Sequence, residues 1–160
     1  MSSKDQPAAT LAASKDAEIR ASFARQGLMQ GIGAALAELG PGRCRIELPF
    51  SDLVGQQHGF FHGGAIGAVA DTAGGYAALT LLPAGSEVLT LEYKINFLRP
   101  AAGARLAAEG VVLRSGRSVT VTRVDVHVLA DGQMLLCAAL QQSVMRAPGG
   151  PPAPVPPGQR

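Results

Sequence analysis

The sequence has few aromatic side chains and little net charge. It contains no tryptophan, only 4% of its 160 residues are aromatic, and the formal net charge at pH 7 is +2. No run of basic residues is present. Nucleic-acid binding needs basic side chains for the phosphates, and single strands also need aromatic rings for stacking. We therefore expect no nucleic-acid partner.

Cysteine and long hydrophobic runs are also scarce. Cys44 and Cys137 are far apart, lack metal-ligand spacing and occupy apolar positions of expected strands, which predicts buried free thiols. No apolar run of membrane-spanning length lacks a glycine break, and the N-terminus does not have the profile of a signal peptide. These absences favour a reduced, cytoplasmic protein without a membrane partner.

The length fits a single domain with a real core. Residues 1–15 are rich in alanine and serine and predict a disordered leader, and residues 148–160 are rich in proline and glycine and predict a disordered tail. The domain itself should then cover residues 16–147.

Hydrophobic periodicity within the domain predicts one long helix and about five or six antiparallel strands, an α+β fold. A short outer helix is expected from Asp16 to about Leu28, with Asp16 as a possible N-cap. In the fifth expected strand the apolar positions change from odd to even numbers, which predicts a bulge near Thr122 and Arg123. The expected strands are 34–39, 43–50, 88–98, 104–114, 118–129 and 133–145.

The stretch from Gln56 to Leu82 predicts a loop that leads into a long, apolar helix. The helical part, from about Gly63 to Leu82, contains Asp71 as its single acidic residue. A helix this apolar is expected to be buried. A carboxylate on a buried helix is costly unless it is paired or used, so Asp71 is a candidate functional residue.

The expected helix has two different faces. One carries a bulky stripe at helical spacing: Ile66, Val69, Ala73, Tyr76 and Thr80. The other is almost bare and includes the acid: Gly67, Asp71, Gly74, Gly75 and Ala78. Glycines weaken a helix and are tolerated where a backbone or a ligand must come close. We interpret the second face as a site of close approach.

The first turn of the helix predicts a site for a developing negative charge. Gly63 and Gly64 present backbone N–H groups at the positive end of the helix. Asp71 lies seven or eight residues further on, or about 11–12 Å along the axis. One carbonyl group cannot contact both groups of one chain. If both act in one reaction, Asp71 must come from a second copy packed antiparallel.

Several motifs together resemble those of the PaaI-type acyl-CoA thioesterases of the hotdog-fold superfamily. They are Gln56, His62-Gly63-Gly64 with Asp71 nine residues after the histidine, and the segment from Leu91 to Pro100 with its Asn-Phe-Leu-Arg-Pro end. The similarity covers roughly residues 16–146. It implies a long helix wrapped by a curved antiparallel sheet, and dimers that often pair into tetramers.

The resemblance also implies roles for individual residues. Asp71 would be either the general base that activates water or the nucleophile; the alternative is a structural carboxylate satisfied by a hydroxyl such as Thr90. His62 would hold the loop so that the Gly63 N–H polarises the thioester carbonyl, although a lone histidine more often only caps a helix. Gln56 occupies a position where many relatives have asparagine, and its amide would position water or the carbonyl. Thr90 aligns with a hydroxyl that orients the lytic water, and a plain strand threonine is the alternative.

The substrate-binding candidates lie at the helix start and at strand ends: Gly64, Arg99, Arg114, Gly116 and Arg117. The segment from Arg114 to Arg117 resembles a turn that family members use near the CoA phosphates, and guanidinium groups suit phosphate. Solvated loop charge is the alternative. His58 and His62 are four residues apart, but they span a glycine-containing loop without a third ligand. We expect neither a metal nor another cofactor.

The sequence therefore predicts an enzyme that hydrolyses acyl-CoA thioesters to a free acid and CoA. A hotdog-fold dehydratase or hydratase is the second enzymatic reading, and it requires a different placement of histidine and aspartate. A non-catalytic acyl-CoA-binding hotdog protein is the alternative from another class. The acyl preference stays open between aromatic and aliphatic chains.

Overall fold

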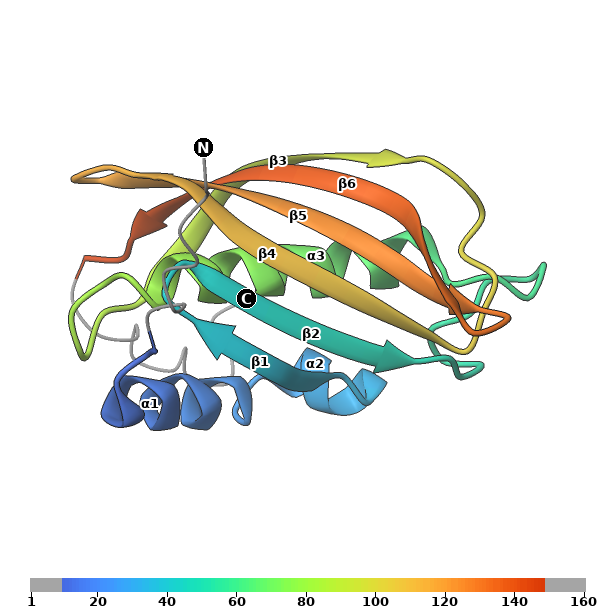
Figure 1. Cartoon of the computed structure of the whole chain (residues 1–160), viewed down its shortest axis with the longest axis horizontal. Helices are drawn as coiled ribbons and strands as arrows, with labels where there is room; N and C mark the ends of the chain where they lie inside the picture. Colours follow the sequence, from blue (N-terminus) through green and yellow to red (C-terminus); the bar gives the residue numbers. More distant parts are fainter. Residues whose placement is uncertain (1–9, 149–160) are drawn as a thin grey trace, which may run out of the picture.

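The computed structural model describes residues 10–148, which form one long helix packed against a six-stranded antiparallel sheet (Figure 1). The helices are α1 (Ala13–Phe23), α2 (Gly27–Ile32) and α3 (Gly63–Leu79). The strands are β1 (Ala35–Gly40), β2 (Arg43–Pro49), β3 (Val88–Phe97), β4 (Arg105–Ser115), β5 (Val119–Ala130) and β6 (Gln133–Arg146). The sheet order is β1-β2-β4-β5-β6-β3. The predicted combination of one long helix with an antiparallel sheet is confirmed.

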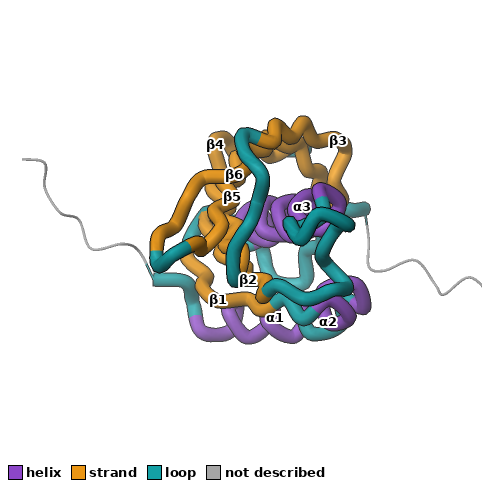
Figure 2. Tube along the Cα trace, turned by 90° about the vertical axis from the view of Figure 1, so that its right-hand side faces the viewer, coloured by secondary structure: helices purple, strands orange, loops and turns teal. Residues whose placement is uncertain are grey.

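The core lies between α3 and the concave face of the sheet, which curves around the helix (Figure 2). Ile66, Val69 and Ala73 of the predicted bulky stripe are buried against strand side chains such as Leu106 and Val126. The apolar composition of α3 fits this position, because the sheet covers most of the surface of the helix. Within residues 10–148, none of the helices combines the length and the hydropathy that a membrane span requires.

The N-terminal region differs from the prediction. The expected single helix is interrupted after Phe23, and a second helix begins at Gly27. Asp16 lies within α1, where its carboxylate accepts a hydrogen bond from Arg20 at 2.6 Å, and Ala12 is the N-cap. Leu28 is exposed. α1 begins three residues before the predicted start; residues 1–9 of the expected leader and 149–160 of the expected tail lie outside the described residues.

The bulge predicted near Thr122 and Arg123 is wrong for β5. The even-numbered residues of β5 face the core along the whole strand, with Thr120 and Thr122 buried and Val119 exposed. The odd-to-even change in the sequence arises because two threonines occupy inward positions. The register shifts that bend this region lie in the neighbouring strands, at Leu113 of β4 and Cys137 of β6.

β3 is an edge strand with a bulge that the alternating sequence pattern does not reveal. Its pairing with β6 changes from Thr90 opposite Val144 to Glu92 opposite Ser143, so Leu91 is the extra residue. A one-residue bulge exchanges the two faces of a strand. Thr90 therefore lies on the same face as Tyr93, toward α3, and not on the opposite face as simple alternation predicts.

One predicted bare position of α3 packs against the chain's own sheet. A side chain on Gly74 would collide with Gln142 Oε1, and it would come within 2.7 Å of Thr122 Oγ1. A side chain on Gly75, the next residue, would make only an ordinary contact, because its Cβ would lie 3.9 Å from Val88. The glycine at 74 is therefore a packing requirement, since a polar pair from β5 and β6 lies directly over it.

We expect Gly74→Ala to lower the free energy of unfolding by about 1–3 kcal/mol, as overpacking does. Gly75→Ala is the matched control because it makes the same change one residue away, where alanine fits. It should be neutral or stabilise the protein by up to about 1 kcal/mol through helix propensity. Thermal unfolding of both variants at equal protein concentration measures the difference; equal stability would contradict the packing described here.

Candidate active site

Three elements bring polar side chains together around Asp71. The carboxylate of Asp71, on α3, accepts hydrogen bonds at Oδ1 from Thr90 Oγ1 of β3 at 2.7 Å and from Gln142 Nε2 of β6 at 3.0 Å. No described residue donates to Asp71 Oδ2. Two donors on one oxygen fix the carboxylate and leave the other oxygen available to a ligand.

Gln142 is the residue of this cluster that sequence reasoning missed. It is 1% exposed, and its Nε2 also contacts the backbone oxygen of Asp71 and Thr90 Oγ1, both at 3.3 Å. A signal was present in the sequence. Gln142 lies between Leu140 and Val144 on the inward face of its strand, where a polar side chain needs a partner.

The space around Asp71 is a cavity of about 560 Å³. Its lining includes Gly64, Ala68 and Thr72 on one side of α3, Thr90 and Tyr93 on β3, and residues of α1 and α2. Most α3 residues in this lining are small, with Tyr76 and Leu79 as the large ones, and Gly64 is exposed while Asp71 and Thr72 are half-buried. The uncovered face of α3 is therefore narrower than predicted, because Gly67, Gly74 and Ala78 are buried within the chain.

The start of α3 is held by a histidine cap. His62 is the N-cap residue, and its Nδ1 accepts a hydrogen bond from the Gly64 N–H at 2.8 Å. The Gly64 amide is thus occupied. Gly63 is the first residue of α3, and its N–H has no acceptor within its own helix. His62 therefore caps the first turn of α3, and the Gly63 N–H has no acceptor among the described residues.

A second cavity, of about 420 Å³, lies at the helix start and is lined by Gln56, Gly63, Phe97 and Arg99 among others. The Gln56 side-chain oxygen accepts a hydrogen bond from the His58 N–H, which leaves the amide NH₂ as the free end. The structure thus brings three of the predicted site residues to one cavity, namely Gln56, Gly63 and Arg99. Asp71 and Thr90 belong to the first cavity, about 12 Å along the helix, so one chain does not unite the two groups.

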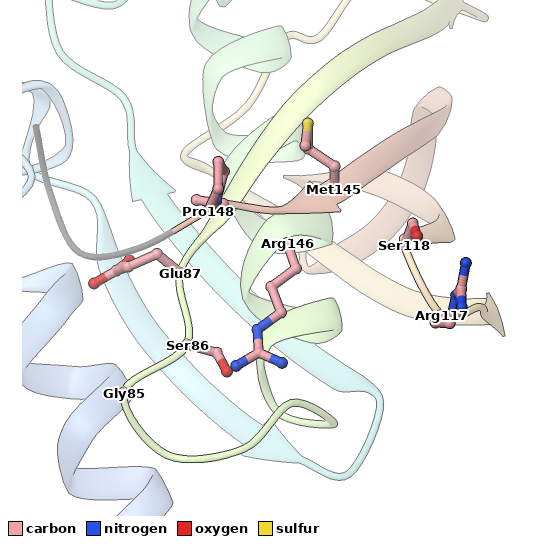
Figure 3. Close-up of a pocket in the computed structure, with 9 residues that line it drawn as sticks. Gly85, Ser86, Glu87, Arg117, Ser118, Met145, Arg146 and Pro148 are labelled. Atoms are coloured by element: carbon pink, nitrogen blue, oxygen red, sulfur yellow. The ribbon is translucent and has the colours of Figure 1, made fainter.

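Arg117 lines a third cavity, of about 470 Å³, together with Ser86, Glu87 and Arg146 (Figure 3). The Arg146 side chain extends toward Ser86, which is 4% exposed and whose Oγ has no hydrogen-bond partner among the described residues. Glu87 also lines the cavity around Asp71, so the two spaces adjoin.

The other two residues of the predicted phosphate turn do not share this cavity. Arg114 is exposed on β4 and is not part of its lining. The Gly116 N–H donates to the Val119 oxygen at 2.9 Å and closes the β4–β5 hairpin. Arg146, which sequence reasoning did not single out, lines this cavity together with Arg117.

The described residues offer no cysteine nucleophile and no cluster of three metal-ligating side chains. Both cysteines are free and buried, as predicted. Burial raises the pKa of Cys44 to about 12 and that of Cys137 to about 11, so neither thiol ionises near neutral pH. Asp71 is then the candidate for the reactive group.

A long helix wrapped by a curved antiparallel sheet is the arrangement of a hotdog-fold protein. Residues 58–135 match the profile of the Thioesterase superfamily. The chain belongs to this superfamily, and the similarity to PaaI-type thioesterases predicted from the sequence is confirmed.

Solved structures support this assignment. A thioesterase family protein from Silicibacter pomeroyi is 38% identical and superposes with a TM-score of 0.82, covering 84% of this chain and 99% of the other. The PaaI protein from the phenylacetic acid degradation operon of E. coli superposes with a TM-score of 0.76, covering 88% of this chain and 99% of the other. At 20% identity, the second similarity concerns the fold alone.

Curated relatives agree. A Saccharolobus solfataricus protein described as "Putative esterase" is 40% identical over 93 residues, which are 58% of this chain and 65% of that protein. A Halobacterium salinarum protein with the same description is 33% identical over 110 residues, 66% of this chain and 72% of that protein. The chain thus spans about two thirds of the length of these relatives.

Proposed function

We propose that the protein hydrolyses acyl-CoA thioesters to a free acid and CoA, with Asp71 as the reactive acid. The observation that carries the proposal is the Asp71 carboxylate, held at Oδ1 by two donors and open at Oδ2 toward a cavity of about 560 Å³. Membership of the Thioesterase superfamily supports thioester hydrolysis in general. The choice of CoA as the thiol is the specific part of the proposal.

Two routes fit this carboxylate. As a general base, Asp71 takes a proton from water, the hydroxide adds to the carbonyl carbon, and the carbon–sulfur bond then breaks. As a nucleophile, Oδ2 attacks the carbonyl carbon and expels the CoA thiolate, and water hydrolyses the mixed anhydride. In both routes the thiolate leaves with the electron pair of the carbon–sulfur bond and takes up a proton. Thr90 orients the carboxylate, since its hydroxyl donates to Asp71.

The Gly63 N–H would polarise the thioester carbonyl, because an amide at a helix start stabilises a developing oxyanion. His62 keeps this turn in place as its N-cap, and the Gln56 amide lies in the same cavity. Because the Gly63 N–H and Asp71 are about 12 Å apart on one helix, we place the active site between two subunits, with one group from each.

The uncovered surface around the two cavities supports a homodimer. β3 is an edge strand, and Leu91, Tyr93 and Phe97 on it are 53%, 47% and 53% exposed. An exposed edge with large apolar side chains is a surface for pairing with another chain. Tyr93 lines the Asp71 cavity and Phe97 the Gly63 cavity, so a second copy at this edge would cover both. Pairing of dimers into tetramers remains part of the proposal, as the family resemblance implies.

We further propose that Arg117 and Arg146 bind the phosphates of CoA. Arginine binds phosphate through paired N–H donors, and Arg117 and Arg146 both line one cavity that adjoins the Asp71 cavity. Arg99 lies instead beside Gly63, where it would contact the substrate near the thioester.

Changing both Arg117 and Arg146 to alanine should raise the KM for acyl-CoA by at least about 10-fold, because remote binding energy is lost. The KM for the matching acyl-pantetheine thioester, which lacks the nucleotide, should stay within about 2-fold. Arg114→Ala is the matched control, since Arg114 is exposed outside this cavity. Steady-state kinetics with both substrates checks this; equal losses on both would assign the arginines a structural role.

Release of free thiol from a panel of aromatic and aliphatic acyl-CoA thioesters tests the function itself. The proposal expects catalytic release of CoA from at least one of them. A dehydratase or hydratase would change the acyl chain without releasing thiol. A non-catalytic binding protein would bind acyl-CoA and leave it intact. Either outcome would overturn the proposal.

A further inference from the structure

The amide of Gln142 is a buried polar group whose hydrogen-bond partners all lie at its NH₂ end. Its Nε2 faces Asp71 and Thr90, and contacts three oxygen atoms of these two residues at 3.0–3.3 Å. Gln142 is 1% exposed. Burying an amide is costly unless hydrogen bonds compensate, so a glutamine on the inner face of a sheet needs a specific reason to be there.

The other end of the amide faces Thr122. Gln142 lies directly opposite Thr122 in the pairing of β5 with β6. Gln142 Oε1 and Thr122 Oγ1 are both buried, and neither has a hydrogen-bond partner among the described residues. Both oxygen atoms lie next to Gly74, in the space that a side chain on this residue would occupy. A hydroxyl can donate or accept, and the Thr122 hydroxyl lies near Oε1 without a hydrogen bond to it.

The Asp71 carboxylate determines which end of the Gln142 amide faces it. An amide oxygen toward Asp71 would put two acceptors in contact, whereas the NH₂ end donates to Asp71 Oδ1. Gln142 is neutral at every pH, so it donates to Asp71 without competing for its proton.

We propose that Gln142 is the positioning residue of the reaction, which holds Asp71 through Oδ1 so that Oδ2 faces the thioester. The inference rests on the proposed function, because it assigns a role in the reaction of Asp71. Gln142 is covered by α3 and acts on the substrate only through Asp71 and Thr90.

The first test replaces Gln142 with methionine, which has a similar shape and no donor. Losing a hydrogen bond to a charged group should lower kcat for thiol release by about 10- to 100-fold. The KM should change by no more than about 2-fold, since Gln142 does not line the Asp71 cavity. Gln141→Met is the matched control, because Gln141 is the adjacent residue on the exposed face of β6. It should keep the wild-type kcat within about 2-fold.

The second test replaces Gln142 with glutamate and follows kcat against pH. When protonated, the new carboxyl group donates to Asp71 as the glutamine does. When ionised, it cannot donate and it repels Asp71, and two close carboxylates share one proton up to an unusually high pH. The ratio of variant to wild-type kcat should therefore fall by at least about 10-fold between about pH 5 and pH 9. Glu87, the other carboxylate lining the cavity, is present in both proteins and cancels in the ratio.

The proposal is overturned if Gln142→Met keeps kcat within about 3-fold of the wild type, or if the Gln142→Glu ratio does not change with pH while the variant stays folded by circular dichroism. If Gln142→Met does not fold, the pH profile of Gln142→Glu decides. An active wild type with unaffected variants refutes this inference alone, whereas a wild type without thiol release refutes the proposed function as well.

Discussion

Asp71→Asn should keep the fold and lower kcat for acyl-CoA hydrolysis by at least about 10²-fold. Losing a general base or a nucleophile has an effect of this size. Asparagine has nearly the same shape as aspartate, and its side-chain oxygen can still accept the hydrogen bonds from Thr90 and Gln142. The substitution therefore removes the charge and the reactive oxygen while preserving most of the packing. The measurement is steady-state thiol release, with circular dichroism as the check on folding.

Asp125→Asn is the matched control for this experiment. Asp125 lies on β5 with its carboxylate paired to Arg123 on the exposed side of the sheet, at 3.0 Å. A surface pair of this kind contributes at most about 1 kcal/mol to stability. We expect this variant to keep full activity. A well-folded Asp71→Asn protein with wild-type turnover would exclude Asp71 from the chemistry.

Mixing two inactive variants should restore activity. One parent is Asp71→Asn, and the other is Gly63→Pro, which removes the N–H at the first helical residue. Proline is well accepted at that position, and the extended backbone of His62, with φ −66° and ψ 136°, is compatible with a following proline. If each site takes Gly63 from one chain and Asp71 from the other, a mixed dimer has one intact site and one site with both changes.

Random mixing makes half of the dimers mixed, and each of these has one of its two sites intact. The activity after co-refolding should therefore reach about a quarter of the wild-type value. Each parent refolded alone is the control and should stay inactive. If the mixture stays inactive although mixed dimers are detected, each site belongs to one chain.

The sheet and the long helix follow from the sequence because their signals are local. Strict alternation in residues 43–50 and turn residues such as Gly132, which adopts a positive φ of 75°, place the strands within one or two residues of their observed ends. The apolar character of residues 63–82 identifies the buried helix for the same reason. These patterns depend on each strand or helix having one face toward a core.

The details that build the site depend on contacts between distant segments. The bulge at Leu91 turns Thr90 toward the helix, and no local pattern announces it, since residues 88–98 alternate on both sides of it. The odd-to-even change in β5 suggests a bulge there, whereas the true cause is that Thr122 faces inward next to Gln142. Asp71, Thr90 and Gln142 come from three elements, and only the folded sheet brings them within hydrogen-bond distance.

The proposed phosphate-binding arginines also depend on contacts between segments that are distant in the sequence. The sequence identifies Arg117 through its turn, and the structure adds Arg146, which follows Arg117 by 29 residues and lies at the end of β6. Arg146 pairs with Val88 at the start of β3, and this pairing is not visible from spacing. Strand pairing, and not sequence proximity, therefore decides which charges share a cavity.

The clearest experiment is a crystal structure of the protein with a ketone analogue of acyl-CoA, in which a methylene group between the sulfur and the carbonyl carbon prevents hydrolysis and the carbonyl oxygen is kept. If one thioester lies between two subunits, the carbonyl oxygen of the analogue should lie about 3 Å from the Gly63 nitrogen of one subunit. Asp71 Oδ2 of the other subunit should then face the carbonyl carbon. An analogue that contacts Asp71 and Gly63 of the same chain, or that binds away from Asp71, would contradict it.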